Sequence, residues 1–215
     1  MEMNKRNRRL LFLACVLVLQ LVTALSLLCY SARVKAYAIR NGRVIQLACK
    51  AYDPFSPFKG RYVRLTFDQS QIEESLLDEE SKVIAQDSQN KKVFCLMKEG
   101  ADGLWTVRAI RKKGMADIQK DEGIYIEGKC LYCRYDYDGN DKQVRTVHIG
   151  YSFDEYYMQE NYARYVDKIH WDDFNALEPV LSLYVAKDGR CIQQGLTVVD
   201  GGERISIEEY CRKRL

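Results

Sequence analysis

The residues of this sequence whose spacing most directly suggests metal binding or redox chemistry are two cysteines. Cys130 and Cys133 form a C-x-x-C pair, which occurs in zinc sites and in thiol–disulfide oxidoreductases. A zinc site generally needs a second paired unit, and the other cysteines beyond residue 32 are isolated: Cys49, Cys95, Cys191 and Cys211. The pair lies in a strand-like run, where positions i and i+3 face opposite sides. We therefore expect packing thiols, with a disulfide and a metal or redox site as the two alternatives.

Two carboxylates could form a second kind of site. Asp53 precedes Pro54, and Glu160 follows an aromatic run. If both converged with Tyr62 and Tyr157 on one pocket, they could bind a small ligand or support hydrolysis. A local interpretation is simpler, because Asp53 can cap a turn and Glu160 can begin a helix, where the dipole favours negative charge. A ligand-binding or hydrolytic site around Asp53 and Glu160 is therefore the alternative hypothesis.

The signatures of common enzyme classes are absent from the sequence. It contains no G-x-S-x-G, H-E-x-x-H, P-loop or G-x-G-x-x-G pattern. Its two histidines, His148 and His170, are too few for a His-rich metal site. We therefore expect a non-catalytic protein with no cofactor and no metal beyond the Cys130/Cys133 alternative.

The positive charge of the chain is concentrated at its N-terminus. The 215 residues carry 33 Lys plus Arg and 30 Asp plus Glu, a formal net charge of +3. Residues 1–9 hold that whole excess, because they contain four basic residues and a single acidic one. The remainder is neutral and lacks the basic surface that nucleic-acid binding requires. The charge is therefore a signal of membrane topology and argues against a nucleic-acid partner.

Residues 10–32 form an uncharged, largely apolar stretch, LLFLACVLVLQLVTALSLLCYSA. At about 1.5 Å per residue in a helix, such a stretch crosses a hydrocarbon core of about 30 Å. A cleaved signal peptide has a shorter apolar region, so we predict an uncleaved transmembrane anchor. The basic tail, residues 1–9, favours a cytoplasmic N-terminus. Residues 33–215 are then a single extracytoplasmic domain.

Strand patterns dominate that domain. Residues 61–67 alternate in the manner of a half-buried strand, and residues 34–49 read as an extended approach with a turn at 41–42. Three hairpins are predicted around turns at 102–103, 138–141 and 188–189. We expect a mainly β (α+β) fold, with an antiparallel sheet or barrel-like domain that follows one N-terminal transmembrane helix.

Two or three short helices complete this prediction. Ser70 and Glu73 match a capping box for a helix within 68–85, and Ser206 and Glu209 match another near the C-terminus. Residues 157–169 place apolar side chains along one helical face.

The stretch GRYVRLTF at residues 60–67 resembles the motif of the bacterial GDYXXLXY family. Gly60, Tyr62 and Leu65 match that motif, Phe67 replaces its final Tyr, and Arg61 replaces its Asp. The resemblance covers residues 47–201 and extends to further positions: Asp53, Pro54, Pro57, Gly150, Tyr157, Glu160, Gly189 and Leu196. If the motif Asp were catalytic or metal-binding in relatives, Arg61 could not perform the same chemistry here.

The resemblance implies a membrane-anchored, mostly extracytoplasmic domain that accompanies a multi-spanning membrane protein, and it implies no particular activity. Together with the missing catalytic signatures, it leads us to expect a membrane-tethered, non-catalytic interaction or scaffold domain of the bacterial cell envelope. The motif residues are then expected to be structural.

Overall fold

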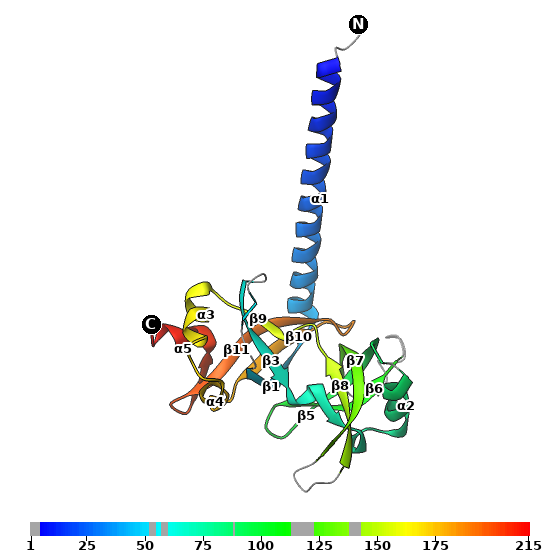
Figure 1. The fold of residues 1–215 in the computed structure, drawn as a ribbon, viewed down its shortest axis with the longest axis vertical. Coiled ribbons are helices and arrows are strands. Elements are labelled where there is room, and N and C mark those ends of the chain that lie inside the picture. The colour runs from blue at the N-terminus through cyan, green and yellow to red at the C-terminus, as the bar shows by residue number, and fades with distance from the viewer. Residues whose placement is uncertain (1–4, 52–54, 57–59, 88, 113–122, 138–142) are drawn as a thin grey trace. The chain divides into compact units, whose positions relative to one another are not determined.

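The computed structural model describes residues 5–51, 55–56, 60–87, 89–112, 123–137 and 143–215. The chain divides into two compact units, residues 1–41 and residues 42–215 (Figure 1). The first unit contains helix α1, and the second contains all the strands and the remaining helices.

Helix α1 (Lys5–Asn41) is long and apolar enough over Phe12–Asn41 to span a membrane, and an 18-residue stretch of it has a mean hydropathy of 2.5. The helix continues through residues 34–41, where an extended approach was expected. This stretch contains Ala36 and Ala38 and lacks both Gly and Pro, so an existing helix propagates through it at little cost. The helix ends at the expected turn, and the first strand begins at Arg43.

Seven described strands form the first sheet. Its order is β12-β11-β10-β1-β3-β2, and β9 also pairs with β3. The bounds are β1 (Arg43–Ala51), β2 (Phe55–Ser56), β3 (Gly60–Phe67), β9 (Glu155–Tyr157), β10 (Val180–Val185), β11 (Cys191–Asp200) and β12 (Glu203–Ser206). Every pairing in it is antiparallel.

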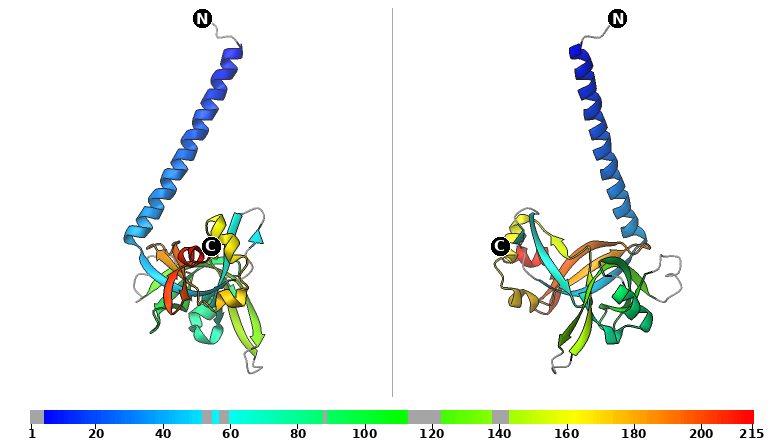
Figure 2. Two further views of the ribbon diagram at one scale, coloured as in Figure 1. Left: turned by 90° about the vertical axis from the view of Figure 1, so that its left-hand side faces the viewer. Right: turned by 45° about the vertical axis from the view of Figure 1, so that its right-hand side comes forward.

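The second sheet has five described strands in the order β4-β8-β7-β5-β6, again antiparallel throughout. Its bounds are β4 (Gln71–Glu73), β5 (Lys91–Glu99), β6 (Trp105–Arg111), β7 (Ile124–Tyr137) and β8 (Gln143–Gly150). Both sheets curl like half-barrels (Figure 2). The predicted mainly β fold with an N-terminal apolar helix is therefore confirmed.

The three predicted hairpins are present as β5–β6, β7–β8 and β10–β11. In the first, Gly103 has a φ of 78°, and the Leu104 N–H donates to Asp102 Oδ1 at 3.1 Å. The third turns at Gly189, whose φ is also 78°. The turn of β7–β8, residues 138–142, lies outside the described residues.

Four short helices accompany the sheets. They are α2 (Glu79–Asp87), α3 (Glu160–Val166), α4 (Trp171–Asn175) and α5 (Ile207–Arg212). The predicted cap of α5 is confirmed, because the Glu209 N–H donates to Ser206 Oγ at 3.1 Å. The helix expected within 157–169 is also present, as α3.

The helix predicted within 68–85 begins later than its capping box indicated. Ser70 ends a 3-10 turn, and Glu73 belongs to β4, which pairs with β8 through Ile72 and Val147. Helix α2 follows, and the Ser81 N–H donates to Asp78 Oδ1 at 2.8 Å. The capping-box prediction was wrong because strand pairing and burial of Ile72 outweighed a local helix signal.

The turn of β10–β11 joins the two sheets. The Glu127 N–H of β7 donates to the Gly189 carbonyl at 2.8 Å. A Cβ at Gly189 would lie 3.3 Å from Tyr125 O and 3.4 Å from Glu127 N. This position therefore requires glycine for two reasons: its φ is positive, and the two backbones approach each other closely.

Candidate functional site

The motif strand β3 contributes mainly to the core. Leu65 and Phe67 are buried, and the ring of Phe67 packs edge-on against Tyr151 and Phe153, with centroids 6.2 Å and 5.3 Å apart. Such edge-to-face aromatic packing stabilises the fold beyond the contribution of the apolar area that these rings bury. The apolar positions of the motif therefore belong to the hydrophobic core of residues 42–215.

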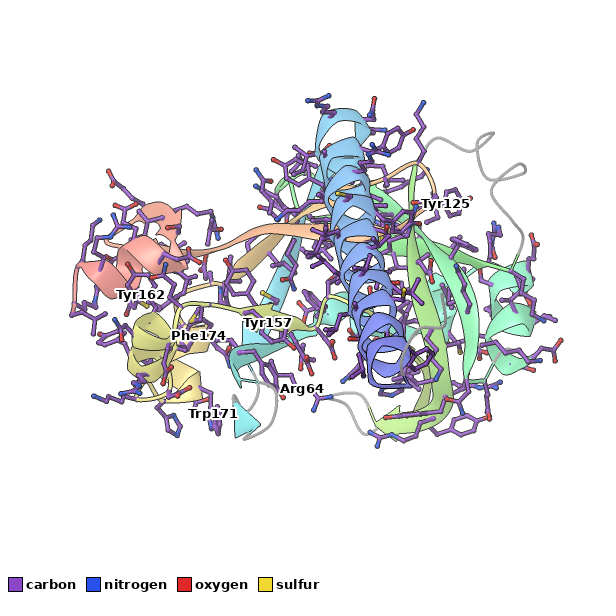
Figure 3. All side chains as sticks on the ribbon, turned by 90° about the horizontal axis from the view of Figure 1, so that it is seen from above. Arg64, Tyr125, Tyr157, Tyr162, Trp171 and Phe174 are labelled. Atoms are coloured by element: carbon purple, nitrogen blue, oxygen red, sulfur yellow. The ribbon has the colours of Figure 1, made fainter. Side chains whose placement is uncertain are left out.

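At its other end, β3 presents an exposed surface. Tyr62 lies opposite Tyr157 of β9, with ring centroids 5.7 Å apart, and Arg64 lies opposite Glu155. The Tyr157 hydroxyl donates to Glu155 Oε2 at 2.7 Å, while Tyr157 as a residue remains 54% exposed. We call Arg64, Glu155 and Tyr157 the β3–β9 face; Figure 3 labels Arg64 and Tyr157.

The backbone beneath the β3–β9 face is fixed by contacts that sequence reasoning missed. The Gln193 amide donates from Nε2 to the carbonyls of Phe153 and Glu155 at 2.9 and 3.0 Å. The Leu65 N–H donates to Asp154 O at 2.7 Å. No local signal in the sequence points to Gln193, because its partners are about forty residues away.

The two candidate carboxylates do not form a described pair. Glu160 begins α3 and accepts hydrogen bonds from Arg164, with the closer nitrogen, Nη2, at 2.6 Å from Oε1. This is the local helix-start position that its sequence suggested. Asp53 and Pro54 lie outside the described residues, as does Pro57.

The family-like glycines serve the packing of the second sheet and its contact with the first. Gly150 ends β8, and a Cβ there would lie 3.2 Å from Leu131 Cδ2. Gly189 forms the turn that docks on β7. Both therefore occupy positions that restrict side-chain size.

Cys130 and Cys133 lie on the same side of β7, where opposite sides were expected. The register between β7 and β8 shifts at Leu131, because Cys130 pairs with Ile149 whereas Tyr132 pairs with His148. One extra residue in a strand makes a β-bulge and changes which side the following side chains face. Both Sγ atoms lie near the Ala85 carbonyl, at 3.5 Å for Cys130 and 3.6 Å for Cys133.

These two thiols differ in accessibility and surroundings. Cys130 is fully buried, and desolvation raises its pKa to about 11. Cys133 is half-buried; burial raises its pKa, while the neighbouring Arg145 guanidinium lowers it. Arg145 in turn pairs with Glu74, with Nη1 3.3 Å from Oε1. A cation therefore adjoins the more accessible of the two sulfur atoms.

The other cysteines of residues 42–215 behave as packing thiols. Cys49, Cys95 and Cys211 are buried and Cys191 is half-buried, and all four are free. Desolvation raises the pKa of Cys49, Cys95 and Cys191 to about 12. Such thiols remain protonated, and therefore unreactive, at neutral pH.

The two histidines lie in different environments. His148 is buried and stacks on Tyr132, with ring centroids 4.4 Å apart. His170 is exposed, and its Nδ1 lies 3.4 Å from Asp172 Oδ2.

A sequence model of the GDYXXLXY protein family matches residues 24–196. The chain belongs to the GDYXXLXY family. No curated protein and no solved structure is detectably similar to it.

The match to the GDYXXLXY family extends beyond the region of the visible motif. It begins inside α1 and ends in β11, so it includes part of the apolar helix, the whole second sheet, and the first sheet except β12 and the end of β11. The motif that gives the GDYXXLXY family its name lies on β3, where Leu65 and Phe67 are core residues and Tyr62 supports Tyr157. The Asp of the family motif is replaced here by Arg61, of whose side chain the structure gives no placement.

Proposed function

We propose that this GDYXXLXY family protein is a membrane-tethered interaction domain of the bacterial cell envelope, without catalytic activity of its own. The observation that carries this proposal is the β3–β9 face, an exposed aromatic and charged surface beside the family motif. Aromatic and Arg side chains on a well-supported backbone are typical of the residues that dominate protein–protein binding energy.

The β3–β9 face is well ordered by the core beneath it. Tyr62 is buried under Tyr157, and Gln193 fixes the backbone on both sides of Asp154. An ordered surface loses little conformational entropy when it binds. The carboxylates near it are engaged locally, since Glu155 accepts from Tyr157 and Glu160 from Arg164. These contacts favour a binding surface over a hydrolytic site.

The anchor suggests the kind of partner. A single membrane-spanning helix confines the domain to the membrane surface, where its effective concentration toward another membrane protein is raised. We therefore propose that the partner is a multi-spanning membrane protein. The basic tail supports an N-terminus in the cytoplasm and a domain outside it.

Site-specific photo-crosslinking in membranes tests the interaction. A photoreactive phenylalanine analogue would replace Tyr157 in the full-length protein, and the matched control would replace Tyr135, another exposed tyrosine (60%). We expect a discrete crosslinked membrane protein from position 157 and none from position 135. The proposal fails if neither position crosslinks, or if both yield the same products.

Protease protection tests the orientation. A tag after Leu215 should be removed by protease added to spheroplasts, and it should be protected in inside-out vesicles. The opposite result would place the domain in the cytoplasm, and a partner would then have to be sought on that side.

A further inference from the structure

The bulge in β7 brings the two thiols of the C-x-x-C pair together, which the spacing alone would not do on a regular strand. In a regular strand Cys130 and Cys133 would face opposite sides, whereas the extra residue Leu131 turns both toward α2. Their sulfur atoms share one neighbour, the Ala85 carbonyl, at 3.5 and 3.6 Å. The structure thus places two soft ligand atoms side by side.

One cation lies beside this dithiol, although burial raises the pKa of both thiols. Arg145 of β8 lies close enough to Cys133 to act on its pKa, and the ion pair of Arg145 with Glu74 holds the guanidinium in place. Arg145 also lies over the ring of Tyr135, at 5.9 Å from the centroid. A negative charge that develops on the Cys133 sulfur would therefore be attracted by the Arg145 guanidinium and repelled by the Glu74 carboxylate.

The number of ligands decides which metal ion fits. Structural zinc requires four ligands, and no group of three or more His, Cys, Asp and Glu is assembled in the described parts of the chain. Soft monovalent ions such as Cu(I) and Ag(I) favour thiolates and are satisfied by two of them in a linear arrangement. A two-sulfur site thus selects this class of ion over zinc.

We propose that Cys130 and Cys133 bind one soft monovalent metal ion, Cu(I) or Ag(I), as a pair of thiolates. Two S–H bonds break and two metal–sulfur bonds form. Two protons leave to solvent, and no atom changes its oxidation state. The product carries one net negative charge and lies next to the Arg145–Glu74 ion pair. Access is from the side of Cys133, because Cys130 is fully buried. This binding activity is independent of the proposed interaction function.

A competition experiment tests the site. The reduced full-length protein in detergent would be titrated with Cu(I) against a chromophoric Cu(I) chelator. We expect each wild-type molecule to retain one Cu(I) ion in the presence of the chelator. Cys133→Ser should lose that ion, whereas Cys191→Ser, which alters a half-buried thiol on the first sheet, should keep it. X-ray absorption at the copper edge should report two sulfur ligands.

Arg145 provides a second test. Arg145→Gln should weaken Cu(I) binding by about 10- to 100-fold, the usual cost of losing a group that supports a metal ligand. Arg145→Lys keeps the charge and should restore most of the affinity, which a purely structural role would not predict.

Three results would overturn the proposal. They are a wild type that retains no Cu(I), a Cys133→Ser variant that binds as the wild type does, and equal losses in Cys133→Ser and Cys191→Ser. Circular dichroism of each variant separates loss of the site from loss of the fold.

Discussion

Strands β3 and β7 differ in how closely they follow simple alternation. In β3, Val63, Leu65 and Phe67 face the core with the period of two of a regular strand, and on the other side Arg64 is exposed while Tyr62 is covered by Tyr157. In β7, the register shift at Leu131 breaks that period and brings Cys130 and Cys133 to one side. The regular strand contributes to the core and to the exposed β3–β9 face, whereas the irregular strand brings two thiols together. The following predictions test this contrast, from the largest expected effect to the smallest.

Truncating the aromatic core of β3 should have the largest effect. Phe67 is 1% exposed and contacts two further rings, so Phe67→Ala should lower the free energy of unfolding by about 3–5 kcal/mol. Thermal unfolding of the full-length protein in detergent measures this change. In β7, Cys133→Ala removes a half-buried thiol and should cost much less; a similar loss in both variants would remove the distinction between the strands.

The contact between the two sheets should show a smaller effect. Gly189 and Gly103 both have a φ of 78°, but a Cβ meets backbone atoms of β7 at 3.3–3.4 Å only at Gly189, and nothing within 4 Å at Gly103. Gly103→Ala should cost about 1–2 kcal/mol for the left-handed backbone, and Gly189→Ala should cost more. Chemical denaturation compares the two variants, and equal losses would show that the close approach relaxes freely.

Buried thiols should make stability fall at high pH. Burial raises the pKa of Cys95 from 9.0 to about 12, so the folded state holds a proton that the unfolded state releases. The stabilisation is complete below about pH 9 and is lost as the pH rises toward 12. Between pH 8 and 10 the cost is about 1 kcal/mol for such a thiol. Cys95→Ala should flatten the pH dependence of unfolding; an unchanged slope would contradict this origin.

Removing the charge of Glu160 should have the smallest effect. Its ion pair with Arg164 is exposed, so Glu160→Gln should lower the free energy of unfolding by only about 0.3–0.5 kcal/mol. The same variant should leave crosslinking from position 157 unchanged. Loss of that crosslink would instead assign Glu160 to the binding surface.

Sequence patterns were reliable where local chemistry and tertiary structure agree. The turns at Gly103 and Gly189 and the cap at Ser206 follow from residue types that suit those conformations, and all three are present. Ser70 and Glu73 also form a local helix signal, but Gln71–Glu73 gains more by pairing with β8. The orientation of Cys133 could not be read from the sequence, because a bulge depends on the neighbouring strand rather than on the bulged residue alone.

The sequence by itself therefore determined the membrane-length apolar helix, the family motif, the mainly β class and the neutral charge of the domain. Each of these depends on composition or on short-range periodicity. Tertiary structure alone decided that Gln193 fixes the backbone beneath the β3–β9 face, that the turn at Gly189 joins the two sheets, and that Cys130 and Cys133 meet beside Arg145. These features depend on contacts between residues distant in sequence or on strand register, which pairing and core packing set together.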